Sequence, residues 1–285
     1  MMDVKSFFDP DTATVTHLVI DHKTKSCAVI DPVMEYDAVT GALKTGAADK
    51  LVQYIQDNGL QLEWLLETHI HADHLTASAY IRDQIGGQIA IGEKITDVLN
   101  YWVPFFNTDA DTPPDGSQFD KLLKDGEKLK LGDLEIGVIH TPGHTPACVS
   151  YHIEDAVFVG DTVFMPNLGT ARADFPGGDA GELYDSIQKL FALPDETRVF
   201  ICHDYPANGG APSWQTTIGE QKKDNAFVGG GVTKEDFVTK REARDKTLRV
   251  PQLLLPSIQF NLRAGKLPDA EKNGTHYLKI PINKL

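Results

Sequence analysis

The sequence has 285 residues, with 27 Lys and Arg residues against 41 Asp and Glu residues, which gives a formal net charge of −14. An acidic chain repels both nucleic-acid phosphates and anionic lipid surfaces, so we expect neither nucleic acid nor a membrane as a partner. A hydrophobic fraction of 41% with 24% charged residues excludes a disordered chain and is typical of a folded globular protein.

Apolar patterns predict strands and helices in the first part of the chain. β-branched runs and short apolar runs predict strands, whereas apolar residues with a helical period predict helices that end at glycines. We expect strands at 14–21, 27–31, 62–67 and 88–91, and helices at 47–58 and 75–85. Residues 107–118 are rich in Asp, Thr, Pro and Gly, which predicts a surface loop.

The second part of the chain repeats this organisation. We expect strands at 128–131, 134–139, 148–153, 156–159 and 198–202, and helices at 183–191 and 234–248. Residues 209–231 are glycine-rich without a strong period, so we expect irregular structure there, and prolines interrupt the tail from residue 250. Two β-rich halves with helices favour two sheets packed together and covered by helices on the outside.

The three cysteines, Cys27, Cys148 and Cys202, are too few and too scattered for a disulfide framework. Their odd number indicates a reducing compartment, and we interpret Cys148 and Cys202 as small buried residues. The N-terminus lacks a signal-peptide pattern, and no apolar run approaches the ~20 residues of a membrane span. We therefore expect a cytoplasmic protein.

The segment with the most chemical information is Thr-His-Ile-His-Ala-Asp-His at 68–74. His69 and His71 are two residues apart, so in an extended backbone they project to the same side. Asp73 and His74 follow where the predicted strand turns into the predicted helix. Imidazoles and carboxylates bind Zn, Fe or Mn, so this cluster predicts a metal site.

Three later residues have the same context, because each lies just after a predicted strand. They are His144, within His-Thr-Pro-Gly-His, Asp161, within Val-Gly-Asp-Thr, and His203, within Ile-Cys-His-Asp. Ligands at successive strand ends predict a site along one edge of the β scaffold. The other histidines lack this context and are interpreted as structural; these are His17, His22, His140, His152 and His276.

This pattern, HxHxDH followed by His144, Asp161 and His203, resembles the metallo-β-lactamase superfamily over residues 12–205. The resemblance implies an α/β fold, the αβ/βα sandwich, in which two mixed β-sheets are flanked by helices and a metal lies at one sheet edge. We expect a catalytic domain over 1–250 and a C-terminal extension over 251–285 packed on it. A metal-free binding module with the same fold is an open alternative.

The spacing of the ligands would serve two metals. One would bind His69, His71 and His144, and the other Asp73, His74 and His203, with Asp161 bridging them. That arrangement predicts a dinuclear Zn(II) hydrolase with an activated hydroxide. Within the superfamily this alternative resembles the hydroxyacylglutathione hydrolase, glyoxalase II.

The segments around the ligands are more similar to the persulfide dioxygenase family, in its bacterial sulfide-detoxification branch. They are 140–151, 160–164, 169–175 and 203–205. That resemblance implies one Fe(II) per chain held by His69, His144 and Asp161, with O₂ oxidising glutathione persulfide to sulfite and glutathione. The other candidate ligands would then orient these groups and bond to water: His71, Asp73, His74 and His203. We also expect a homodimer.

Glutathione carries two carboxylates, so an acidic protein needs a local positive charge to hold it. Arg172 and Tyr205, both close to predicted ligands, are the candidate substrate contacts. Arg172 could instead form an ion pair with Asp174, and Tyr205 could be a packing residue. The segment Arg172-Ala-Asp174 differs in its middle residue from the Arg-Thr-Asp of the persulfide dioxygenases.

Overall fold

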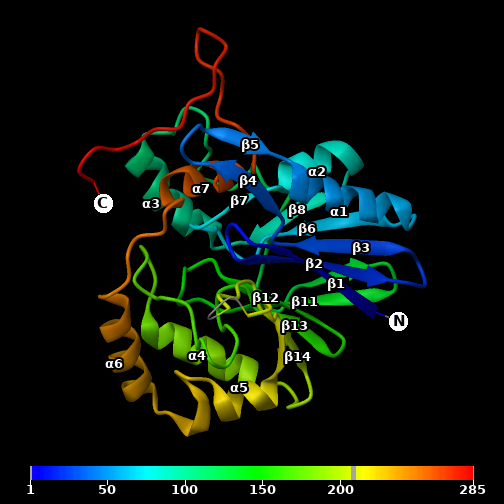
Figure 1. Ribbon diagram of the computed structural model, residues 1–285, viewed down its shortest axis with the longest axis vertical. Coiled ribbons are helices and arrows are strands. Elements are labelled where there is room, and N and C mark those ends of the chain that lie inside the picture. Colours follow the sequence, from blue (N-terminus) through cyan, green and yellow to red (C-terminus); the bar gives the residue numbers. More distant parts are fainter. Residues whose placement is uncertain (1, 207–209, 285) are drawn as a thin grey trace.

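A computed structural model describes residues 2–206 and 210–284 and contains two six-stranded sheets packed face to face (Figure 1). In spatial order the first sheet comprises β1 (Met2–Asp9), β2 (Thr14–Asp21), β3 (Ser26–Ile30), β6 (Gln61–Leu66), β8 (Gln88–Gly92) and β9 (Lys121–Leu123). Its first three strands are antiparallel, whereas β3, β6, β8 and β9 run parallel. This sheet is therefore mixed, as the resemblance implied.

The second large sheet is also mixed. Its order is β10 (Lys128–Leu131), β11 (Leu134–His140), β12 (Val149–Ile153), β13 (Ala156–Phe158), β14 (Arg198–Phe200) and β15 (Gln215–Thr217), and only the β13–β14 pair is parallel. A small third sheet has the order β5 (Ala42–Lys44), β4 (Val33–Asp37) and β7 (Leu75–Thr76).

Helices form the two outer layers of the sandwich (Figure 1). The first half carries α1 (Gly46–Asp57), α2 (Ser78–Ile85), α3 (Ile95–Phe106) and the late helix α7 (Leu254–Asn261). The second half carries α4 (Ala180–Phe191), α5 (Ile218–Asp224) and α6 (Lys234–Asp245), with a short 3₁₀ turn at Gly229–Gly231. Three apolar cores lie between these layers, one under each helical layer and one between the sheets. The layering confirms the predicted αβ/βα sandwich.

Two of the predicted elements differ from the structure. The helix expected at 75–85 begins at Ser78, because Leu75 and Thr76 pair instead with Met34 and Val33 of β4. The irregular structure expected at 209–231 is wrong over β15 and α5; residue 209 lies outside the described residues. The Thr217 side chain and Glu220 form a reciprocal capping box that starts α5, a signal readable in the sequence.

The C-terminal segment packs on the first half of the molecule. Leu254, Ile258 and Phe260 of α7 are buried in the core that α1, α2 and α3 form with the first sheet. The helix also lies against β7, the short strand that follows the histidine cluster. Within the described residues, no helix combines the length and the apolar character needed to cross a membrane.

Candidate metal centre

The ends of four strands position the seven predicted ligands. The cluster at 69–74 follows β6 of the first sheet, whereas His144, Asp161 and His203 follow β11, β13 and β14 of the second sheet. His203 reaches back to the first sheet, where it forms a bridge with Thr14 at the start of β2. The structure therefore brings all seven residues together where the two sheets meet, and it buries all of their side chains except Asp73, which is 26% exposed.

His69, His144 and Asp161 form one group, in which one potential ligand atom from each residue lies within 4.8 Å of the others. Asp161 Oδ2 lies 4.0 Å from Nε2 of His69 and 3.6 Å from Nε2 of His144. The two imidazole rings are nearly perpendicular, with an interplanar angle of 89°. Two imidazoles and one carboxylate on one face form a donor set that suits non-haem Fe(II) and also Zn(II).

Hydrogen bonds fix which nitrogen of each histidine faces the group. Nδ1 of His144 donates to the backbone carbonyl oxygen of Arg172 at 2.7 Å. The Thr68 hydroxyl donates to Asp31 at 2.8 Å, so it accepts its other hydrogen bond from Nδ1 of His69, at 3.0 Å. Both Nε2 atoms are therefore left with free lone pairs. Burial also lowers the pKa of His69 well below its usual value, which favours the neutral form that binds metals.

The remaining candidates form a second group: His71, Asp73, His74 and His203. Nε2 of His203 lies 3.2 Å from Asp73 Oδ2 and 3.4 Å from Asp161 Oδ1. Burial disfavours the charged form of His203, but these carboxylates outweigh it and raise its pKa. Nδ1 of His71 and Nε2 of His74 are buried, and neither has a hydrogen-bond partner among the residues that the structure describes.

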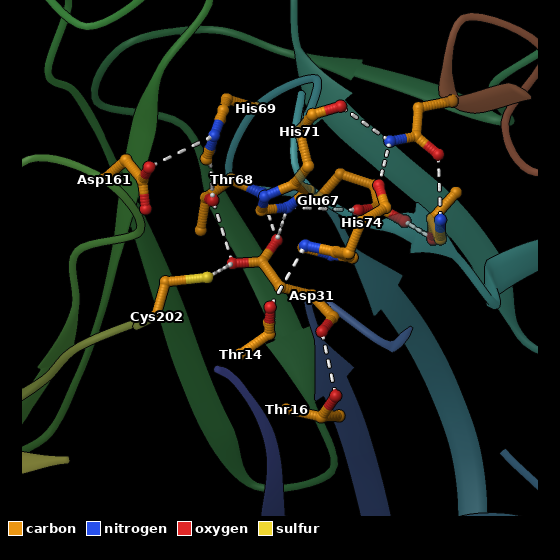
Figure 2. A network of polar contacts seen from close by, with 12 residues as sticks. Thr14, Thr16, Asp31, Glu67, Thr68, His69, His71, His74, Asp161 and Cys202 are labelled. Atoms are coloured by element: carbon orange, nitrogen blue, oxygen red, sulfur yellow. Dashed lines mark hydrogen bonds and ion pairs between the residues drawn. The ribbon is translucent and has the colours of Figure 1, made fainter. Parts of the chain in front are cut away.

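Asp31, which the sequence did not single out, lies at the centre of the polar network in Figure 2. Its carboxylate accepts hydrogen bonds from the backbone N–H and hydroxyl of Thr68, from Nε2 of His71 at 3.0 Å, and from the Cys202 thiol at 3.7 Å. Asp31 also has a left-handed backbone conformation, with φ of +51°. An aspartate directly after an apolar strand and before a proline was the only local signal for it.

Asn261 of α7 is a second residue that the sequence did not single out. Its side-chain amide donates to the backbone carbonyl oxygens of His71 and His74 at 2.9 and 2.8 Å, and its amide oxygen accepts from Thr76 N–H at 2.8 Å. Asn261 is 2% exposed. The C-terminal segment therefore holds the backbone of the loop that carries four candidate ligands.

A cavity of about 810 Å³ is lined at the metal centre by Asp73, His144 and Asp161, which we call its base. Both predicted substrate contacts, Arg172 and Tyr205, line it. Arg172 makes a bidentate ion pair with Asp174 at 2.6 and 2.8 Å, as the bracing alternative expected. Tyr205 stacks on His203 and remains 50% exposed, so it has both a packing contact and access to the cavity.

The cysteines near this site are buried, as expected of small core residues. Burial raises the pKa of Cys148 to about 12, and its sulfur accepts a hydrogen bond from the Thr145 N–H at 3.3 Å. Burial also raises the pKa of Cys202. Both thiols therefore stay protonated at neutral pH, which makes them poor nucleophiles.

Comparisons with known proteins agree with this geometry. The model of the metallo-beta-lactamase superfamily matches residues 10–203. The chain is 48% identical to a probable metallo-hydrolase of Burkholderia pseudomallei, over 100% of both proteins, and 49% identical to glyoxylase B2 of Dictyostelium discoideum, over 99% of this chain and 97% of that protein. It is 29% identical to the mitochondrial persulfide dioxygenase ETHE1 of Homo sapiens, over 92% of this chain and 88% of that protein.

Among solved structures, the crystal structure of ETHE1 from Myxococcus xanthus superposes with a TM-score of 0.75 and 29% sequence identity. The match covers 93% of this chain and 100% of that chain. It therefore extends over nearly the whole chain.

Proposed function

The chain belongs to the metallo-beta-lactamase superfamily, and from its metal centre we propose that it is a persulfide dioxygenase with one Fe(II) per chain. The proposed reaction converts glutathione persulfide, O₂ and water to glutathione, sulfite and two protons. The outer sulfur loses four electrons, O₂ accepts them, and water supplies the third oxygen atom of sulfite. The proposal also includes a cytoplasmic location, a homodimer and a catalytic domain over 1–250. These three parts rest on the sequence alone.

The observation that carries the proposal is how the candidate ligand atoms are distributed between the two groups. His71, which a dinuclear site would share with His69 and His144, groups instead with Asp73, His74 and His203. His69, His144 and Asp161 then form a group of two histidines and one carboxylate, and Asp161 also lies beside His203 of the second group. Fe(II) bound there would supply open coordination positions and electrons for oxygenating sulfur, which redox-inert Zn(II) does not.

The protein's own groups have three tasks in this proposal. Asp31, through Thr68, and the Arg172 carbonyl hold the two ligand imidazoles in the orientation that metal binding needs. His203 and Asp73, beside Asp161, hold the water that the reaction consumes and accept its protons. The cavity admits an elongated persulfide with its sulfur end at the base.

The relatives support this choice in part. ETHE1 of Homo sapiens carries the name persulfide dioxygenase, and ETHE1 of Myxococcus xanthus has the same fold over nearly the whole chain. The relatives at 48% and 49% identity carry the names metallo-hydrolase and glyoxylase instead. Their names favour the second candidate function.

That second candidate is a dinuclear Zn(II) hydrolase of glutathione thioesters. The buried, unpartnered Nδ1 of His71 and Nε2 of His74 favour it, because in a dinuclear site His71 would bind one metal and His74 the other, which would satisfy both atoms. Metal analysis of the purified protein, with S-lactoylglutathione hydrolysis measured in parallel, separates the two functions. One iron per chain without hydrolysis supports the dioxygenase, whereas two zinc ions per chain with hydrolysis would establish the alternative.

A further inference from the structure

We infer that Arg244 and Arg249 bind the carboxylate groups of the substrate while its sulfur end lies at the base of the cavity. The inference rests on the proposed function for the identity of the substrate, a thiol peptide with two carboxylates. The inference adds an anion-binding wall to the cavity. Arg244, at the end of α6, and Arg249, in the segment that follows α6, form this wall. Neither arginine was among the predicted substrate contacts.

The charged residues that line the cavity come from two parts of the chain. The carboxylates outside the metal centre come from the N-terminal part of the chain, at Asp9, Asp11 and Glu35. The positive charges come from the loop after Asp161 and from the C-terminal part, at Arg172, Arg241, Arg244 and Arg249. A substrate with two carboxylates is repelled by the first set, so its binding depends on the arginine side.

Two of these four arginines are already neutralised by carboxylates. Arg172 forms its bidentate pair with Asp174. Arg241 is 3% exposed and contacts Asp245 with Nε at 2.9 Å and Nη2 at 2.6 Å. Asp245 also accepts a hydrogen bond from Ala173 N–H, so this pair holds the loop that carries Arg172. Both arginines therefore brace the wall and add little net charge to it.

The other two guanidinium groups are available to a ligand. Arg249 makes no side-chain hydrogen bond or ion pair with any residue of 2–206 or 210–284. Arg244 has only one long contact, 3.4 Å to the Thr247 hydroxyl. The backbone of Arg249 is nevertheless fixed, because its carbonyl oxygen accepts a hydrogen bond from Nη1 of Arg172 at 2.8 Å. Arg172 is thus a positioning residue for Arg249 in this inference.

The ligand class follows from the chemistry of this wall. A guanidinium group binds a carboxylate through two parallel hydrogen bonds, a geometry that lysine does not offer. Phe175, Phe227 and Leu248 supply apolar surface beside the arginines. The wall therefore favours a peptide-like thiol with free carboxylates over a neutral or cationic thiol.

Binding of reduced glutathione to the metal-loaded enzyme, measured by calorimetry, tests the wall without turnover. We expect Arg249→Gln and Arg244→Gln each to raise the dissociation constant about tenfold, and Arg249→Lys to raise it less. Lys246→Gln is the matched control, because Lys246 loses the same charge on the same segment, is exposed and does not line the cavity. Equal dissociation constants for Arg249→Gln, Arg244→Gln and Lys246→Gln would overturn the inference.

Kinetics on two persulfides give the second readout. We expect both arginine variants to raise the KM for glutathione persulfide about tenfold with kcat within twofold, and to leave the KM for the persulfide of glutathione diethyl ester unchanged. An equal rise in KM for both substrates would overturn the inference. If the parent enzyme oxidises neither persulfide, the proposed function fails, and the glutathione dissociation constants still test the arginine wall.

Discussion

The side-chain amide of Asn261 donates a 2.8 Å hydrogen bond to the backbone carbonyl oxygen of His74, which lies 187 residues earlier in the sequence. The same amide nitrogen donates to His71 O, and the amide oxygen accepts from Thr76 N–H. One buried side chain on α7 thus satisfies three backbone groups of the loop that carries the ligands. The C-terminal segment is part of the support of the metal centre.

Replacing Asn261 by Ala removes all three of these hydrogen bonds and leaves buried backbone groups without partners. We expect the free energy of unfolding to fall by about 3 kcal/mol and the metal affinity to fall roughly tenfold. Chemical denaturation and competition with a chelator measure the two quantities. Asn273→Ala is the control, because Asn273 is exposed on the same segment. Unchanged metal affinity in Asn261→Ala would show that α7 does not support the site.

The Thr68 hydroxyl connects Asp31 to the ligand His69. Thr68→Val keeps the β-branched shape but leaves Nδ1 of His69 without an acceptor, so we expect the metal affinity to fall about tenfold. Thr68→Ser retains the hydroxyl and should bind metal within about threefold of the parent protein. Chelator competition on both variants measures this difference. Equal affinities for the Val and Ser variants would contradict the orienting role of Thr68.

Gly143 lies at the turn that precedes His144, with φ of +130°, and a Cβ atom there would lie 2.3 Å from the backbone N and Cα of Leu183 in α4. We expect Gly143→Ala to lower the free energy of unfolding by about 3 kcal/mol or more, because the backbone of a helix cannot shift locally to make room for the added Cβ atom. Gly86→Ala is the control for backbone strain alone, because Gly86 has φ of +82° and open space around it. Equal losses in the two variants, in thermal or chemical unfolding, would exclude the steric explanation.

His17 is buried between the sheets, and this burial lowers its pKa to about 4. Its neutral form is stabilised by folding, so its contribution is complete above the usual pKa of 6.5 and is lost as the pH falls from 6.5 to about 4. As the pH falls over that range, we expect the free energy of unfolding to fall by about 3 kcal/mol less in metal-free His17→Gln than in the metal-free parent protein.

Unfolding of the two proteins at pH 7 and pH 4.5 measures this difference. His22→Gln is the control, because His22 is exposed. A pH dependence in His17→Gln equal to that of the parent protein would mean that folding does not lower the pKa of His17.

The candidate ligands could be predicted because the information about them is local. Four of them form a contiguous motif, and His144, Asp161 and His203 each follow an apolar strand. The ends of the strands meet at one edge of a β-sandwich. Residues that follow strands in the sequence could therefore be expected to lie close together in space. The layered fold could be predicted for the same reason, since the strand and helix periods are strong in both halves.

The residues that support the site could not be predicted, because their partners are distant in the sequence. Asn261 contacts His71 across 190 residues and lies in a proline-interrupted tail in which no helix was expected. Arg244 lies in the polar stretch 234–248, and Arg249 directly follows it. Such a stretch resembles the solvent-exposed face of an ordinary helix. Only the packing of α6 against the loop after Asp161 places them on the cavity.

Oxygen consumption by the iron-loaded protein tests the central claim most directly. With glutathione persulfide as substrate, we predict one O₂ consumed and one sulfite formed per persulfide, and loss of both in His69→Ala, His144→Ala and Asp161→Ala. A protein that contains iron at one ion per chain yet consumes no O₂ with this substrate would contradict the proposed dioxygenase function.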